Sequence, residues 1–187
     1  MNTTETYPIN VAGVQRELRL FEIKPGVRIA ILNILGDTEL VAAASKALAT
    51  QINKYHPHVL VTAEAKSIPL AHALSAEMGV PYVVLRKSYK PYMGHALQSE
   101  TLSITTGKPQ MLFLDEKDQQ LVSNKRVAIV DDVISTGSTL EGMRLIMHKA
   151  NAEIVAEAAI FTEGDRAQWS DIIALGHLPV WVNGKDE

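Results

Sequence analysis

Short apolar runs alternate with helix-like segments along this chain, and no other feature constrains the fold as strongly. Runs rich in branched residues predict strands at 27–34, 58–63, 80–87, 126–132 and 153–161. Helical patterns predict helices at about 37–55, with Asp37 as N-cap, 69–78 and 137–149. Apolar strands separated by helices predict an α/β fold with a central, mainly parallel sheet flanked by helices.

Two further pairs of short strands complete the expected elements. Residues 101–106 and 110–115 are separated by Gly107, Lys108 and Pro109, which predicts a hairpin. Residues 172–176 and 178–182 predict two short terminal strands. The sequence shows no internal repeat, so we expect a single domain over residues 1–187.

The composition limits the classes of function. Hydrophobic residues make up 47% and charged residues 21% of the 187 residues, which is ordinary for a globular protein. A net charge of -3 gives no global basic field, so we expect no nucleic acid partner. Cysteine is absent, which excludes disulfides and agrees with a reducing cytoplasm. We expect a cytoplasmic chain with no signal peptide and no membrane partner.

Three polar segments follow predicted strands of the central sheet. They are Glu64 to Ser67, Arg86 to Lys90 and Asp131 to Thr139. Right-handed crossovers bring the strand-to-helix loops of such a sheet to one edge. Ligands bind outside the carboxyl ends of these strands, so we expect one ligand site there.

The third segment belongs to the stretch RVAIVDDVISTGST, residues 126–139. Asp131 and Asp132 are adjacent like charges at the end of a buried strand, and burial without partners would be costly. Ribose hydroxyls or a bound Mg²⁺ would supply those partners. Neighbouring side chains of a strand point to opposite faces, so both carboxylates can face one ligand only if the strand has already ended.

Small residues follow the two aspartates and lead into a predicted helix. Ser135, Thr136, Gly137, Ser138 and Thr139 let backbone N–H groups converge at a helix N-terminus, which favours a phosphate monoester. The alternative is a turn at Asp132 and a helix cap at Ser135 or Thr136. Walker A and dinucleotide fingerprints are both absent. A ribose 5-phosphate matches the combination of a phosphate cradle and a diol or metal site.

The run VAIVDDVISTGST resembles the 5-phosphoribosyl-1-pyrophosphate (PRPP) loop of type I phosphoribosyltransferases. The resemblance extends over about residues 27–182 and is nearest to the adenine and xanthine branch. It implies that Asp131 and Asp132 hold the ribose hydroxyls and Mg²⁺, and that residues 135–139 hold the 5-phosphate. It also implies a homodimer and a small base-binding hood, built from about 1–36 and 162–187.

The resemblance also assigns a pyrophosphate site to the other two loops. Its residues are Glu64, Ala65, Lys66, Ser67, Arg86, Lys87 and Lys90. The alternative for Glu64 to Ser67 is an ordinary strand-to-helix turn with a solvated lysine. The alternative for Arg86 to Lys90 is a solvated basic face. Residues 88–113 would form a flexible hairpin loop that closes over the site.

The sequence gives less information on the identity of the purine base than on PRPP. ILNILGD at 31–37 resembles the hood of the xanthine enzyme, which implies base contacts from Leu32 and Asn33; alternatively, Asn33 only ends a strand. Glu163 stands near the place where the xanthine enzyme has a lysine. A 6-amino group needs an acceptor and a 6-oxo group a donor, so Glu163 favours adenine over xanthine.

We therefore expect a Mg²⁺-dependent purine phosphoribosyltransferase that uses PRPP and a purine, with adenine as the first candidate and xanthine as the alternative. A non-catalytic PRPP-sensing regulator is the second class. The basic and acidic loop of the orotate enzyme is not recognisable at 88–98.

Overall fold

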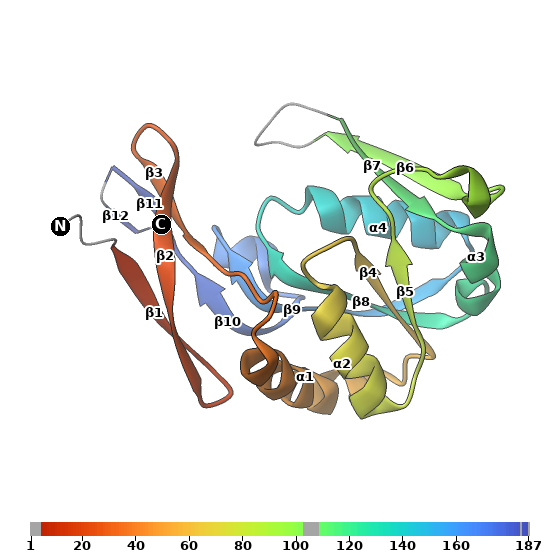
Figure 1. Ribbon diagram of the computed structural model, residues 1–187, viewed down its shortest axis with the longest axis horizontal. Coiled ribbons are helices and arrows are strands. Elements are labelled where there is room, and N and C mark those ends of the chain that lie inside the picture. The colour runs from red at the N-terminus through yellow and green to blue at the C-terminus, as the bar shows by residue number, and fades with distance from the viewer. Residues whose placement is uncertain (1–4, 103–108, 184, 187) are drawn as a thin grey trace.

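The computed structural model describes residues 5–102, 109–183 and 185–186 (Figure 1). Its central sheet contains, in spatial order, β10 (Ile173–Leu178), β9 (Glu153–Glu163), β8 (Arg126–Ile134), β4 (Val59–Ala63) and β5 (Tyr82–Leu85). Every neighbouring pair in this sheet is parallel. The predicted α/β fold with a parallel sheet flanked by helices is thereby confirmed.

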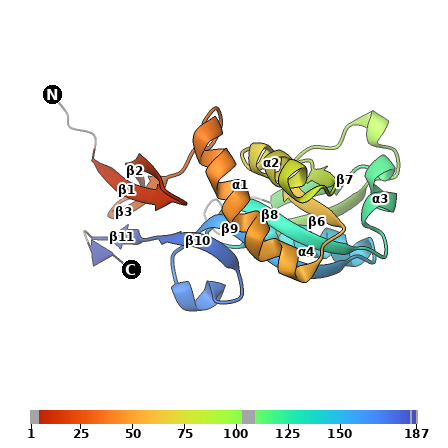
Figure 2. The ribbon, with the colours of Figure 1, turned by 90° about the horizontal axis from the view of Figure 1, so that it is seen from below.

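Helices cover both faces of the central sheet, as Figure 2 shows. The helices α1 (Thr38–Ile52) and α2 (Ile68–Met78) pack on one face, and α4 (Ser138–Lys149) packs on the other. Asp37 caps α1 as predicted, because its Oδ1 accepts a hydrogen bond from the Leu40 amide at 3.1 Å. No helix among the described residues is long and apolar enough to cross a membrane.

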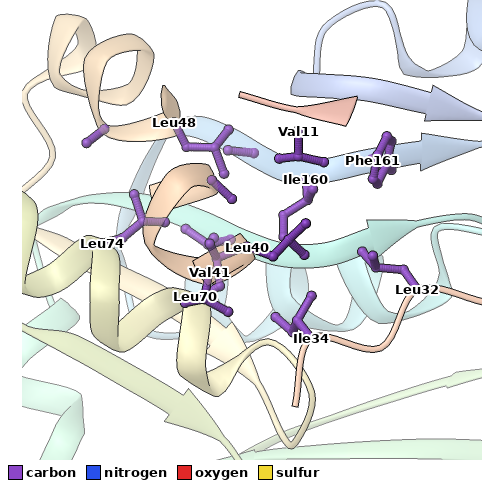
Figure 3. Packing of buried hydrophobic residues seen from close by; sticks show 14 of the residues in the cluster. Val11, Leu32, Ile34, Leu40, Val41, Leu48, Leu70, Leu74, Ile160 and Phe161 are labelled. Carbon is purple, nitrogen blue, oxygen red and sulfur yellow. The ribbon is translucent and has the colours of Figure 1, made fainter. Parts of the chain in front are cut away.

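The sheet separates two hydrophobic clusters, and β8 contributes to both. Ala128 and Val130 belong to the cluster under α1 and α2, part of which Figure 3 shows, whereas Val127 and Ile129 belong to the cluster under α4. This period of two is expected for a strand that is buried on both faces. The strand is therefore held rigidly at the point from which the candidate site begins.

A second sheet is built from both ends of the chain, and we call it the hood sheet. It contains β1 (Thr6–Val11), β2 (Val14–Lys24), β3 (Val27–Ile31), β11 (Val180–Val182) and β12 (Lys185–Asp186), all antiparallel. No strand was predicted for the segment that forms β1 and β2. The predicted strand at 27–34 ends at Ile31, and residues 32–37 turn into α1.

The predicted hairpin is present with a shifted first strand. β6 (Leu97–Leu102) pairs with β7 (Pro109–Leu114) from Leu97 opposite Leu114 to Leu102 opposite Pro109. The prediction placed the first strand at 101–106; it begins earlier, and 103–106 lie outside the described residues. Four short helical elements were not predicted: α3 (Glu116–Val122) and the 3-10 helices η1 (Asn53–Tyr55), η2 (Pro91–Met93) and η3 (Arg166–Trp169).

The hairpin packs along α4, next to the start of that helix (Figure 1). Ser99 Oγ donates to the Gly142 carbonyl at 2.8 Å, and Thr101 Oγ1 donates to the Ser138 carbonyl at 3.1 Å. A Cβ on Gly142 would lie 3.0 Å from Leu112 Cδ1, so the glycine permits this close approach. The described part of the hairpin thus rests on α4.

Replacing Leu74 by alanine should remove a fully buried side chain from the cluster under α1 and α2. We expect the free energy of unfolding in urea to fall by about 2–5 kcal/mol. The matched control is Leu121→Ala on α3, because Leu121 is 40% exposed. This substitution should lower the free energy of unfolding by no more than about 1 kcal/mol. Equal losses in the two variants would contradict this account of the core.

Candidate functional site

A cleft of about 270 Å³ lies between the carboxyl edge of the central sheet and the hood sheet. Four groups of residues line it: Ile29 to Leu32 from β3 and the turn after it, Ala63 to Ser67 with Lys87, Asp131 to Val133 with Ser135 and Thr139, and Glu163. The three segments that the sequence placed at this edge therefore do meet there. Larger grooves flank α4, but most of the predicted site residues do not line them.

Asp131 and Asp132 both line this cleft although β8 continues beyond them to Ile134. The expectation that the strand ends before both carboxylates can face one ligand is therefore wrong. Val130 and Val133 pack against the same cluster, and Ile134 packs against the opposite one. Strict alternation would put residues 130 and 134 on one face, so the alternation breaks between them. This break lets two neighbouring carboxylates reach one cleft.

The two carboxyl groups are buried with few partners. The Asp132 amide donates to Asp131 Oδ1 at 3.0 Å, whereas Asp132 Oδ2 has no hydrogen-bond partner among the described residues. Lys66 Nζ is 3.4 Å from that oxygen, which is an ion-pair separation without hydrogen-bond geometry. Burial, and secondarily the charge of Asp132, raises the pKa of Asp131 to about 7.

These oxygens match the donor set of a hard divalent cation. Mg²⁺ is commonly held by one or two carboxylates together with substrate phosphates and waters. The described residues contain no cluster of three or more acidic, histidine or cysteine side chains that could hold a metal alone. The orphaned Asp132 Oδ2 and its neighbour Asp131 are therefore suited to a cation that arrives with a phosphorylated ligand.

The predicted phosphate cradle forms the turn between β8 and α4. Gly137 is the N-cap of α4 with φ 78°, a left-handed conformation that glycine adopts without strain. Ser135 and Thr139 line the main cleft. Thr136, Gly137 and Ser138 line an adjacent groove. The first turn of α4 therefore leaves amide donors at the boundary of the two spaces.

The loop after β4 is ordered by its own polar contacts. Thr62 Oγ1 donates to Ser67 Oγ at 2.8 Å, and Ser67 Oγ donates to the Ala63 carbonyl at 3.1 Å. Lys66 Nζ donates to the Leu32 carbonyl at 3.2 Å and so connects this loop to the turn below the hood sheet. The Glu64–Ala65 peptide bond is cis.

Glu64 and Arg86 form an ion pair with each other, so their charged groups are not both directed at the cleft. Glu64 Oε2 accepts from the Lys87 amide at 2.9 Å and from Arg86 Nε at 3.1 Å. The Lys87 amide, followed by Arg86, lowers the pKa of Glu64. Arg86 also exchanges two backbone hydrogen bonds with Phe113 of β7, each of 2.9 Å. Glu64 and Lys87 line the cleft, and Arg86 does not.

Lys90 and the hairpin differ from the sequence-based expectation. Lys90 is exposed, and no described residue of 88–113 lines the main cleft. The reason is the packing of β6 and β7 on α4 described above. Their expected roles in pyrophosphate binding and closure therefore have no support from this arrangement.

The predicted base contacts separate into two groups. Glu163 at the end of β9 and Leu32 line the cleft. Asn33 does not line it, because its Oδ1 accepts from the Leu35 amide at 3.2 Å within the turn. Ile29 and Ile31 of β3 line the cleft and were missed, although their alternation in a recognised strand was a usable signal. Burial raises the pKa of Glu163 to about 7, opposed by the charge of Lys66.

The fold and the cleft define an α/β protein with a polar site at the carboxyl edge of a parallel sheet. The sequence model of the phosphoribosyl transferase domain matches residues 32–176. This chain belongs to the phosphoribosyltransferase family.

Two curated relatives of different kinds match the chain. The hypoxanthine/guanine phosphoribosyltransferase of Methanococcus voltae is 32% identical over 163 residues, which cover 87% of this chain and 79% of that protein. The purine biosynthesis transcriptional repressor PurR of Bacillus subtilis is 29% identical over 132 residues, 71% of this chain. The matched part spans only 46% of the repressor's own length.

Solved structures show the same fold at low sequence identity. Adenine phosphoribosyltransferase from Thermoanaerobacter pseudethanolicus superposes with a TM-score of 0.66 at 19% identity, covering 92% of this chain and 95% of that one. The enzyme from Giardia lamblia, solved with 9-deazaadenine, gives 0.67 at 15% identity, covering 92% and 93%. At these identities the likeness establishes the fold.

The buried Glu163 should make the ligand-free protein less stable as pH rises. In the unfolded chain this carboxyl loses its proton near pH 4.5, whereas the folded protein retains the proton to about pH 7. The unfolded state therefore binds fewer protons between these values, and stability falls as pH rises through this window. Glu163→Gln should reduce this fall by roughly 1–3 kcal/mol between pH 4.5 and 7.5 in urea unfolding.

The matched control is Glu77→Gln, because Glu77 is exposed on α2. It should leave the pH dependence of unfolding unchanged. A Glu163→Gln curve that runs parallel to the parent curve would show that Glu163 ionises normally in the folded protein.

Proposed function

We propose that this chain is a purine phosphoribosyltransferase, which converts PRPP and a purine base into a nucleoside 5-monophosphate and pyrophosphate. The observation that carries the proposal is the pair of buried carboxyl groups, Asp131 and Asp132, next to the cradle at the start of α4. Family membership and the Methanococcus relative support the same reaction class.

In this reaction a purine nitrogen forms a bond to C1 of the ribose while the bond from C1 to pyrophosphate breaks. The transition state resembles an oxocarbenium ion, by analogy with glycosyl transfer. The amides and hydroxyls of residues 135–139 hold the 5-phosphate, and Asp131 and Asp132 accept hydrogen bonds from the ribose hydroxyls. Lys66 and Lys87 provide positive charge beside the leaving pyrophosphate. Positioning and charge neutralisation thus account for the protein's contribution.

Asp131 and Asp132 would also hold Mg²⁺. When bound, this ion supplies positive charge for the pyrophosphate oxygens. The Mg²⁺ requirement, the homodimer, the cytoplasmic location and the single domain with a hood remain predictions that accompany the proposal.

Adenine is our proposed base. An ionised Glu163 accepts a hydrogen bond from a 6-amino group, and the apolar side chains of Ile29 and Ile31 provide a surface for a purine ring. The Methanococcus relative is named for hypoxanthine and guanine, which carry 6-oxo groups. A protonated Glu163 would donate to such a group, so 6-oxopurines, including xanthine, are the competitors.

A PRPP-responsive regulator is the second candidate, and the match to PurR of Bacillus subtilis favours it. A sensor would bind PRPP in the same cleft without turnover. The two candidates therefore share the ligand and differ in catalysis.

The deciding measurement is pyrophosphate release from PRPP and Mg²⁺ with adenine, hypoxanthine, guanine, xanthine or orotate, each supplied separately. We expect turnover, with adenine giving the highest kcat/KM. Asp132→Asn should lower kcat/KM roughly 10- to 100-fold, since charge-assisted bonds to the ligand are lost. The matched control is Glu77→Gln, an exposed carboxylate on α2 that lines neither the cleft nor the groove beside it, and it should retain activity.

The outcomes separate the candidates. PRPP binding in calorimetry without turnover on any base would favour the sensor. Preference for a 6-oxopurine would overturn adenine while leaving the reaction class intact. Failure of PRPP to bind would overturn both candidates.

Glu163→Gln tests the base contact itself. An amide both donates and accepts, so it no longer discriminates between 6-amino and 6-oxo groups as an ionised carboxylate does. We expect the ratio of kcat/KM for adenine to that for hypoxanthine to fall about tenfold at pH 8. An unchanged ratio would show that Glu163 does not contact position 6.

A further inference from the structure

Trp169 lies between the two halves of the candidate site. It ends η3, is only 8% exposed, and comes a few residues after Glu163 in the chain. Its indole Nε1 donates to the Glu163 carbonyl at 3.1 Å, and this bond is buried. The tryptophan therefore fixes the backbone from which the proposed base contact extends.

The other end of the same ring system lies against the phosphate loop. A Cβ built on Gly137 would lie only 2.6 Å from Trp169 Cη2. Gly137 is also the N-cap of α4, at the centre of the proposed 5-phosphate cradle. Only a residue without a side chain leaves room for the ring at this position.

The segment that carries Trp169 is ordered by local hydrogen bonds before and after the ring. Asp165 Oδ1 accepts from the Ala167 amide at 2.9 Å, and the Trp169 carbonyl accepts from the Ile172 amide at 3.1 Å. The ring also belongs to the cluster under α4, together with Ile134 and Leu140. A flat, rigid side chain held in this way has little freedom to absorb a movement of the loop.

We propose that Trp169 is a positioning residue that couples occupancy of the phosphate loop to the placement of Glu163. A phosphate that binds the amides around Gly137 moves this loop relative to the Trp169 ring. The hydrogen bond from the indole N–H then transmits the movement to the Glu163 carbonyl. Coupling of this kind is reciprocal, so a bound base strengthens phosphate binding by the same factor. The identities of the two ligands rest on the proposed function.

Fluorescence tests the first half of the coupling. The chain contains two tryptophans, and Trp181 stacks edge-on against Tyr7 in the hood sheet, with ring centroids 5.2 Å apart. Trp181→Phe leaves Trp169 as the only indole. Titration with ribose 5-phosphate and Mg²⁺ should change its emission saturably, with the midpoint that calorimetry gives.

The matched control is Trp169→Phe, which leaves only Trp181. Its emission should not respond to ribose 5-phosphate. Constant Trp169 emission while calorimetry shows binding would overturn the proposal and leave the proposed function intact. Absence of any binding in calorimetry would overturn both.

Calorimetry with two ligands tests the second half. The Kd of ribose 5-phosphate is measured with and without saturating adenine, in the parent chain, in Trp181→Phe and in Trp169→Phe. We expect adenine to tighten binding roughly two- to tenfold in the first two, the range of one hydrogen bond, and to have no effect in Trp169→Phe.

A purely structural role for Trp169 makes a different prediction. Loss of the ring would then lower the unfolding midpoint and leave the ratio of the two Kd values unchanged. Urea unfolding of each variant confirms that the protein measured is folded. An unchanged ratio in folded Trp169→Phe would overturn the coupling.

Discussion

Two neighbouring carboxyl groups at the end of a buried strand are the constraint on which the rest of this structure depends. Asp131 and Asp132 are 8% and 7% exposed, and Asp132 Oδ2 has no hydrogen-bond partner among the described residues. Burial of such groups costs free energy unless they are paired, and the raised pKa of Asp131 reflects this cost. The surrounding fold must therefore be stable enough to offset this cost.

The position of β8 explains how the fold holds that site. The strand lies at the centre of the parallel sheet, between β9 and β4, and its preceding residues pack alternately into both hydrophobic clusters. This alternate packing ends after Val130. The strand then places both carboxylates at the cleft, and the turn at Gly137 follows. The neighbouring parallel strands β4 and β9 place Lys66 and Glu163 at the same edge of the sheet, because the carboxyl ends of parallel strands share one edge.

The sequence was sufficient for the parts of the molecule with strong and local signals. Apolar runs between helical patterns predicted the central sheet, and the run from Asp131 to Thr139 predicted the turn into α4 whose residues line the cleft and the adjacent groove. The strands β1 and β2 were missed because a hood sheet with one solvent-facing side mixes exposed and buried residues without a continuous apolar run. Asn33 and Lys90 lie outside the cleft. The turn hydrogen bond of Asn33 and the packing of the hairpin on α4 are tertiary features that a local sequence pattern does not predict.

The residues proposed to contact the base lie where the family match gives the least information. The phosphoribosyl transferase match covers residues 32–176, which hold the carboxylates, the cradle and Lys66. Ile29 and Ile31 of the hood sheet lie outside it, and Glu163 lies inside it near its end. Membership therefore supports the phosphate side of the site more strongly than the base side. In the proposed site, a carboxyl with a pKa of about 7 would accept from adenine when ionised and donate to a 6-oxopurine when protonated. Under that proposal, the charge around Glu163, including that of Lys66, would determine which base is favoured.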